Sequence, residues 1–267
     1  MELRGGLLVF SPSDLTAYLD CAHLSQLERL VALGSIERPA GDNRHADLVK
    51  EKGDLHERAY LDQLREQGRD VTTIELGDDF DWERAARDTE EAMRRGDDVI
   101  YQGVFVNGSW RGIADFLERV DSPSVLGGWS YEVSDTKLAR HAKPAHVLQL
   151  CFYSEQVARI QGRMPARMHV VSGTGERESF RPDDFLAFYH RIRRRFEDFH
   201  AAGDEVYPLP VSHCSICEFL ERCEQRWIDD DHLTLVALWI EHFDKLDDVD
   251  RQRLPLKPVY FLAPRET

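Results

Sequence analysis

The sequence predicts an α/β fold in which a central mixed sheet is flanked by helices. Strand-like runs occupy residues 99–106, 110–120 and 131–138, and Asn107-Gly108 between the first two favours the tight turn of a hairpin. Runs with helical spacing come before and after these strands, which is the alternation expected of an α/β domain. Apolar residues make up 42% of the chain, which is enough for a sizeable core.

The first predicted helix begins at Ser11, a residue type that caps helices, and Pro12 takes the first helical position. Apolar residues at helical spacing continue to about Leu33, and Gly34 ends the run. Cys21 lies inside this predicted helix. Taken alone, a cysteine in such a place is as well explained by packing as by function.

The other elements follow the same two periodicities. We expect helices over 45–67, 82–95, 145–160 and 182–202, and shorter strands over 71–76, 166–171 and 178–181. A further helix with an acidic start is expected after Trp227, followed by a proline-containing tail.

The net charge of −15 at pH 7 argues against a generally basic surface for nucleic acid. Any DNA contact must come from a local basic groove and from metal ions that neutralise carboxylates. Two basic clusters, 140–143 and 191–195, are explained either as solvent-exposed faces or as phosphate contacts. The sequence has no apolar run of membrane-spanning length and no complete signal peptide, so we expect a cytoplasmic protein.

Residues that could bind a metal or take part in catalysis are concentrated between Gly112 and Tyr153. Because side chains alternate along a strand, Asp135 and Lys137 are expected on one face of one strand, and Asp115 lies in the strand before it. Two acids and a lysine so placed can hold a hard divalent cation and still present a positive charge to a substrate. An isolated Asp115 would be an exposed or capping acid, but its apolar neighbours favour a half-buried carboxylate that needs a partner or a metal.

Three cysteines, Cys214, Cys217 and Cys223, form a C-x2-C-x5-C cluster. Disulfides explain them poorly in a reducing compartment, so metal ligation is the better interpretation. A tetrahedral zinc site would take its fourth ligand from His213 or Cys21, whereas a 4Fe-4S cluster would take Cys21 as its fourth thiolate. Coordination chemistry alone does not separate the two.

Together, these motifs resemble the PD-(D/E)xK nuclease superfamily and, within it, the RecB-like nucleases that carry an iron-sulfur cluster. Such nucleases include CRISPR-associated exonucleases and the nuclease domains of helicase-nuclease proteins. The first acid, the D-x-K element and the Q-x-x-x-Y signature are matched in order by Asp115, Asp135-Thr136-Lys137, and Gln149 with Tyr153. Ala114 stands where the superfamily's name has proline.

A lone histidine on a helix is more often structural than a ligand, and His56 lies within the helix predicted over 45–67. The run Gly53-Asp-Leu-His56-Glu57, however, resembles an upstream motif of RecB-like exonucleases whose histidine binds metal. The resemblance therefore implies that His56 is a metal ligand.

For the whole chain, the resemblance implies a restriction-endonuclease-like nuclease domain over 1–227 and a helical extension with a tail over 228–267. Segments 10–34 and 203–227 would form an iron-sulfur subdomain. In it, a structural 4Fe-4S cluster would be held by four thiolates: Cys21, Cys214, Cys217 and Cys223.

The resemblance also implies roles for the site residues. Mg²⁺ or Mn²⁺ would be bound by His56, Asp115, Asp135 and the backbone carbonyl of Thr136, and would activate the attacking water. Lys137 would orient that water and stabilise the charge on the phosphate. Gln149 and Tyr153 would support the cleft, where both lie on one face of a helix.

We therefore expect a metal-dependent deoxyribonuclease, acting as an exonuclease on the ends of single-stranded DNA. The alternative is a non-catalytic DNA-binding or assembly module that works with a partner helicase or a CRISPR adaptation complex. A zinc-stabilised adaptor is a third interpretation. The sequence has no G-x4-G-K-[ST] motif, so it does not carry the usual phosphate-binding loop of an ATP-driven motor, and it indicates no oligomeric state.

Overall fold

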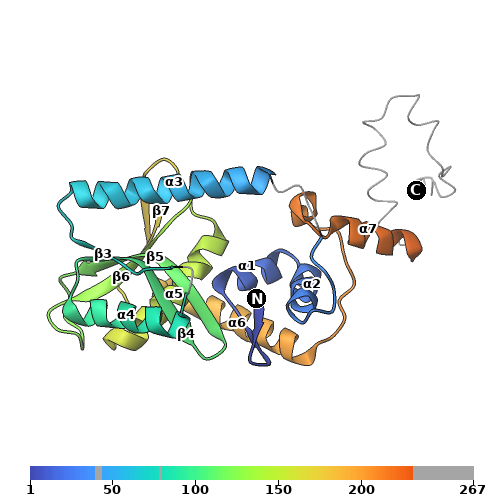
Figure 1. The fold of residues 1–267 in the computed structure, drawn as a ribbon, viewed down its shortest axis with the longest axis horizontal. Helices are drawn as coiled ribbons and strands as arrows, with labels where there is room; N and C mark the ends of the chain where they lie inside the picture. The colour runs from blue at the N-terminus through green and yellow to red at the C-terminus, as the bar shows by residue number, and fades with distance from the viewer. Residues whose placement is uncertain (40–43, 78–79, 231–267) are drawn as a thin grey trace, which may run out of the picture. The chain divides into compact units, whose positions relative to one another are not determined.

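The structure, a computed structural model, describes residues 1–39, 44–77 and 80–230. The chain divides into two compact units, Met1–Val206 and Tyr207–Thr267, and each is described by itself. The first unit holds the sheet and the helices that cover it (Figure 1).

Within the described residues, the helices of the first unit are α1 (Pro12–Asp20), α2 (Ala22–Ala32), α3 (Arg44–Glu66), α4 (Trp82–Arg95), α5 (Pro144–Gln161) and α6 (Leu186–Ala202), with a short 3-10 helix η1 (Pro182–Asp184). Its strands are β1 (Glu2–Arg4), β2 (Leu7–Val9), β3 (Val71–Thr73), β4 (Val99–Asn107), β5 (Trp110–Val120), β6 (Ser130–Thr136), β7 (Met168–Val171) and β8 (Arg177–Phe180).

The main sheet is mixed and runs in the order β3-β4-β5-β6-β7-β8. The pairs β3–β4 and β6–β7 are parallel, and the pairs β4–β5, β5–β6 and β7–β8 are antiparallel. Strands β4 and β5 are joined by the predicted hairpin, where Gly108 takes a φ of 60° that the tight turn requires. The prediction of an α/β fold with a mixed sheet flanked by helices is confirmed.

Helices cover both faces of this sheet (Figure 1). On one face, α3 buries Tyr60 and Leu64 against Phe116 of β5. The adjacent residue Leu117 belongs to a different and larger core, to which α4 and α5 contribute side chains such as Met93. Neighbouring strand residues point to opposite faces, so α3 lies on one side of the sheet and α4 and α5 lie on the other. Burial of each large apolar side chain contributes roughly 1.5–3 kcal/mol to folding.

The helix predicted from Ser11 to Leu33 is divided in two at Cys21, so the prediction that Cys21 lies inside one helix is wrong. Its start is correct, and the Ser11 backbone N–H donates to the carboxylate of Asp14 at 2.7 Å. At Cys21 the backbone is extended, with φ −161° and ψ 113°, and its Sγ accepts a hydrogen bond from the Leu24 backbone N–H at 3.4 Å. This side chain satisfies an N–H of the first turn of α2, as a helix cap does, and the chain begins a new helix there.

Most other elements agree with the sequence. The helix predicted over 82–95 has those bounds. The helices predicted over 45–67 and 145–160 are observed as α3 and α5, whose ends each differ from the prediction by one residue. The helix predicted over 182–202 is instead a 3-10 turn followed by α6, with Phe185 between them. None of the helices in the described ranges is long and apolar enough to cross a membrane.

The second unit, as described to residue 230, contains a 3-10 helix η2 (Ser212–Ile216) and the helix α7 (Leu220–Asp229). Trp227 is buried, and its indole N–H donates to the carbonyl of Pro208 at 2.6 Å, which ties α7 to the loop before η2. The extension and tail predicted over 228–267 lie outside the described residues, apart from the end of α7.

Candidate active site

Two aspartates are brought together where the ladder between β5 and β6 ends. The ladder runs from Val120↔Ser130 to Phe116↔Ser134, and the next residue along each strand is an aspartate, Asp115 on β5 and Asp135 on β6. The Asp115 carboxylate accepts hydrogen bonds from the Thr136 backbone N–H at 2.7 Å and from its hydroxyl at 2.8 Å. The charge of Asp115 also acts on the carboxyl group of Asp135. The structure therefore brings the two predicted acids to neighbouring positions at one end of this ladder.

Lys137 completes this group from the segment just after β6. Its Nζ lies 2.5 Å from Oδ2 of Asp135, and its backbone N–H donates to the carbonyl of Val171 on β7 at 2.9 Å. The strand was predicted to reach residue 138, but β6 ends at Thr136. The bond to Val171 nevertheless holds the backbone of Lys137 beside the neighbouring strand, so the lysine is positioned by the sheet.

Burial affects the pKa values of both Asp135 and Lys137. The side chain of Asp135 is 4% exposed. Burial and the charge of Asp115 raise the pKa of the Asp135 carboxyl to about 8, although Lys137 opposes the rise. Burial also opposes the charge on Lys137, but the carboxylates of Asp135 and Asp115 outweigh it and raise its pKa. One ammonium thus faces two carboxyl groups, and a proton or a further cation is needed to balance them.

Tyr153 of α5 belongs to the same site. It is buried, and burial together with the charges of Asp135 and Asp115 raises the pKa of its hydroxyl well above the usual value. Gly112 of β5 makes this position available, because a Cβ there would lie 2.9 Å from the tyrosine ring. Gln149, one helical turn before Tyr153, is half-buried, and the prediction that it lines the cleft stays a prediction.

His56 is on α3, as predicted, and its ring lies beside the segment that carries the lysine. Its Nε2 is 3.2 Å from the carbonyl of Val171, the same carbonyl that accepts the Lys137 backbone N–H. Across the part of the chain that the structure describes, no three side chains of the histidine, cysteine, aspartate and glutamate types are arranged to hold a metal ion. That His56, Asp115, Asp135 and the Thr136 carbonyl bind a metal stays a prediction of the sequence.

Glu57 ends the Gly53-Asp-Leu-His56-Glu57 run, but the sequence assigned it no role. Burial and the charge of Asp115 raise the pKa of its carboxyl, and its Oε1 accepts a hydrogen bond from the side-chain amide of Gln102 at 3.2 Å. Helical periodicity was the available signal, because Glu57 lies one turn before Tyr60 and two before Leu64, which face the sheet. The residue after the predicted ligand thus feels the charge of Asp115.

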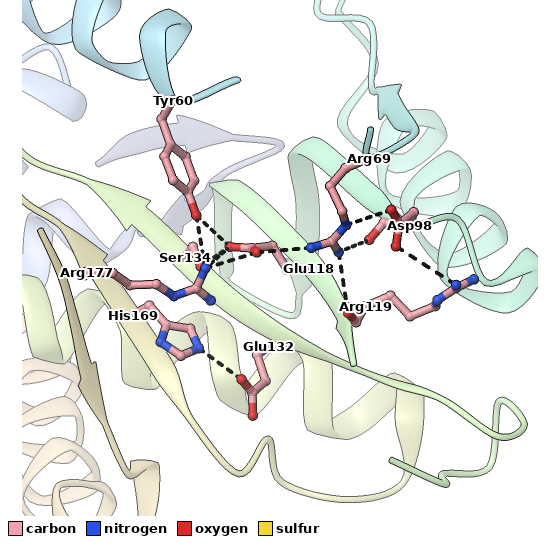
Figure 2. A network of polar contacts seen from close by, with 9 residues as sticks. All are labelled: Tyr60, Arg69, Asp98, Glu118, Arg119, Glu132, Ser134, His169 and Arg177. Carbon is pink, nitrogen blue, oxygen red and sulfur yellow. Dashed lines mark hydrogen bonds and ion pairs between the residues drawn. The ribbon is translucent and has the colours of Figure 1, made fainter. Parts of the chain in front are cut away.

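A network of buried polar contacts holds α3 to the sheet (Figure 2). At its centre is Glu118 of β5, which accepts hydrogen bonds from the Tyr60 hydroxyl at 3.0 Å, from Ser134 at 2.5 Å and from Arg177 at 2.9 Å. Burial works against ionisation of Glu118, but its hydrogen-bond donors and the charge of Arg177 outweigh it and lower its pKa. Tyr60 lies one turn after His56 and Glu57, so this network fixes where both of them meet the strands.

The same figure shows how the network extends. Arg69 donates to Asp98 at 2.6 Å, and His169 of β7 lies 2.9 Å from Glu132 of β6 (Figure 2). The first contact joins the segments that precede β3 and β4, and the second connects β7 to β6 on the side of the sheet that α3 covers. A sheet braced in this way is a rigid support for the residues at the end of the β5–β6 ladder.

The two basic clusters differ in their contacts. Arg193 forms an ion pair at 2.9 Å with Glu155, which ties α6 to α5, and another at 2.9 Å with Glu197 on its own helix. Its neighbours on the solvent side are exposed: Arg191, Arg194 and Arg195. Exposed too are the three basic side chains before α5: Arg140, His141 and Lys143.

In the second unit, the backbone N–H of Cys217 donates to the carbonyl of Cys214 at 3.2 Å, and the Sγ of Cys214 accepts from the Val211 backbone N–H at 3.4 Å. Cys223 is buried in α7. Cys21 belongs to the first unit. The expectation that these thiols are cluster ligands stays a prediction of the sequence.

Comparison of the chain with models of known protein families found no match, and comparison with curated proteins found none either.

Proposed function

We propose that the protein is a metal-dependent deoxyribonuclease whose active site is the Asp115, Asp135 and Lys137 group. The observation that carries the proposal is the convergence of two carboxyl groups and one ammonium at the end of the β5–β6 ladder. Phosphodiester hydrolysis needs an activated water and a stabilised phosphate charge, and these side chains suit both tasks.

The donor set fits Mg²⁺ or Mn²⁺. Both are hard cations that prefer oxygen ligands, and magnesium in particular is usually held by one or two carboxylates while waters and substrate phosphates fill the other positions. Two carboxyl groups at neighbouring strand positions, with the Lys137 ammonium beside one of them, favour such a cation. When bound, the cation would lower the pKa of a bound water and polarise the phosphate.

Each residue of the site would have its own role in the reaction. Asp115 and Asp135 would hold the cation, and Thr136, which is bonded to Asp115, would fix the orientation of that carboxylate. Lys137 would hold the attacking water and pair with the phosphate oxygens. Tyr153 would keep bulk water from one side of the site, and Gln149 would line the cleft one turn away.

We also propose that the main sheet is the core of a PD-(D/E)xK fold. Its acids lie on adjacent antiparallel strands in the middle of a mixed sheet, and its lysine follows two residues after the second acid. For the substrate we propose the ends of single-stranded DNA, which the exposed arginines of α6 would help to attract.

Three substitutions test the activity: Asp115→Ala, Asp135→Ala and Lys137→Ala. Each is expected to abolish Mn²⁺-dependent degradation of end-labelled single-stranded DNA, with far-ultraviolet circular dichroism unchanged. Matched controls are Asp121→Ala and Lys50→Ala, which remove exposed charges outside the site and should keep full activity. Full activity in all three site variants would refute the proposal, and DNA binding without cleavage by the wild type would favour a non-catalytic module that acts with a helicase or a CRISPR adaptation complex.

A further inference from the structure

The helix α6 has a buried face and an exposed face. Four of its side chains are buried in the first unit: Tyr189, Ile192, Phe196 and His200. The other face is exposed and carries one phenylalanine and three arginines: Phe188, Arg191, Arg194 and Arg195. An amphipathic helix ordinarily presents polar side chains to water, so the exposed phenylalanine is the unusual member of this face.

Phe188 differs from the other aromatic side chains in its exposure. It is 54% exposed, and within residues 1–39, 44–77 and 80–230 it is the one phenylalanine, tyrosine or tryptophan that is exposed. A single exposed apolar side chain is common on protein surfaces and by itself indicates nothing. The neighbours of Phe188 are informative, because Arg191 and Arg195 follow at three and seven residues and therefore lie on the same side of the helix.

The arginines of α6 differ in their ion pairs. Arg193 is paired with Glu155 of α5 and with Glu197 of α6, both at 2.9 Å. In the part of the chain that the structure describes, Arg191 and Arg195 form no ion pair. An exposed guanidinium without an acidic partner, in a chain of net charge −15, is available to an anion from outside the protein.

A single strand of nucleic acid matches this combination of side chains. Arginine binds phosphates through paired hydrogen bonds, and an aromatic ring stacks on the face of a base that no neighbouring base pair covers. The stretch from Phe188 to Arg195 covers roughly 10 Å of helix, which is the length of about three stacked nucleotides. Exposed acids mark its two ends, Asp184 before it and Asp198 after it, so the phosphate-binding stretch is short.

We propose that the exposed face of α6 binds single-stranded DNA, with a base stacked on Phe188 and with phosphates paired to Arg191 and Arg195. The inference rests on the proposed function, because it gives the single-stranded substrate a binding surface outside the aspartate group. The ion pair between Arg193 and Glu155 joins α6 to α5. A strand bound on α6 is therefore held beside the helix that contributes Tyr153 to the candidate site.

The test for stacking compares a fluorescent single-stranded oligothymidylate with a fluorescent DNA duplex. Binding is measured by anisotropy in EDTA, so that no metal-dependent cleavage occurs. Phe188→Ala is expected to weaken binding of the single strand by roughly 10-fold and to leave duplex binding unchanged, because the bases of a duplex are covered. Phe188→Trp should keep the single-strand affinity. Phe188→Leu should lose most of it, because leucine is apolar but has no aromatic face.

The arginines have a different expected signature. Arg191→Gln and Arg195→Gln should weaken binding of both DNAs, and each should reduce the slope of log K against log salt for the single strand by about 0.7. Arg87→Gln on α4 and Leu7→Ala on β2 remove exposed side chains of the same kinds and should change neither affinity. Far-ultraviolet circular dichroism should be the same for all variants.

Equal losses of single-strand and duplex affinity in Phe188→Ala, or full single-strand affinity in Phe188→Leu, would overturn the inference. Unchanged DNA binding in Phe188→Ala and in both arginine variants would also overturn it and would indicate a protein partner for this face. Failure of the proposed function is recognised separately, by a wild type that binds the single strand in EDTA but does not cleave it with Mn²⁺. A wild type that cleaves DNA, with variants that bind the single strand equally well, would refute the inference alone.

Discussion

The Nζ atom of Lys137 lies 2.5 Å from Oδ2 of Asp135, at the point where β5 and β6 cease to pair. Asp115, the next residue of β5, lies at the same end of the ladder, and its charge acts on the Asp135 carboxyl group. A buried site with two carboxyl groups and one ammonium is not balanced in charge.

Asp135→Asn should stabilise the protein while it removes the activity. Burial and Asp115 raise the pKa of Asp135, so its ionised form is costly, and an amide of the same shape removes that cost. We expect a gain of about 0.5–2 kcal/mol in the free energy of unfolding, measured by urea titration in EDTA. Asp121→Asn, at an exposed position, is the control and should change nothing. A destabilised Asp135→Asn protein would contradict the account.

Divalent cations should stabilise the wild type by binding the folded state alone. At a free concentration of 100 times the dissociation constant, linkage gives about 2.7 kcal/mol, which a thermal scan with Mn²⁺ or Mg²⁺ against EDTA detects. Asp115→Asn and Asp135→Asn should lose the shift, because each removes one of the two carboxylates. An equal shift in both variants and the wild type would locate the ion elsewhere.

Arg177→Met should loosen α3 from the sheet. Arg177 donates to Glu118 at 2.9 Å and to the Tyr60 hydroxyl at 3.0 Å, so its loss leaves a buried carboxylate with fewer partners. The arginine side chain is 36% exposed, and solvent screening limits the cost to about 1–3 kcal/mol. Hydrogen exchange should increase at residues 56–64 of α3. Arg181→Met, at an exposed position close to Arg177 in the sequence, is the control and should leave exchange unchanged. If α3 is as well protected in Arg177→Met as in the control and the wild type, Arg177 does not hold α3 to the sheet.

His200 should make the fold sensitive to mild acid. It is buried on α6 and hydrogen-bonded to Ser25 of α2 at 3.0 Å; burial, aided by the charge of Arg29, lowers its pKa to about 4. The unfolded chain titrates near pH 6.5, so between about pH 6.5 and 4 it binds a proton that the folded state refuses. Stability is fully present above this window and falls as pH drops through it, by up to about 1.4 kcal/mol per pH unit. His200→Gln should flatten that slope in urea titrations, whereas the exposed His141→Gln should leave it unchanged.

The three cysteines of the C-x2-C-x5-C motif should bind a 4Fe-4S cluster. Protein purified anaerobically is expected to be brown, with about four irons per chain and a visible absorption band that is lost when Cys214, Cys217 or Cys223 is changed to serine. Cys151, which is buried in α5, is the matched control, and Cys151→Ser should keep the colour. A colourless protein with stoichiometric zinc would replace the iron-sulfur cluster with the zinc alternative.

The aspartate pair and its lysine were predictable because they depend on local signals. Strand periodicity places Asp135 and Lys137 on one face, and the Asn107-Gly108 turn identifies the hairpin that leads into Asp115. The Gly53-Asp-Leu-His56-Glu57 run contains Glu57, but the hydrogen bond between Gln102 and Glu57 was not predictable from it. That contact depends on how a distant helix docks on the sheet and on a φ of 57° that glutamine does not favour. At Cys21, a side-chain cap overrode the helical periodicity.

The proposed activity requires that Asp115 and Asp135 share one cation beside Lys137. Anomalous diffraction from crystals grown with Mn²⁺ locates such an ion. We expect a peak within about 2.0–2.6 Å of an oxygen from each of the two carboxylates, and no such peak in Asp135→Asn crystals. A peak at another set of residues, or none in a protein that still cleaves DNA with Mn²⁺, would contradict it.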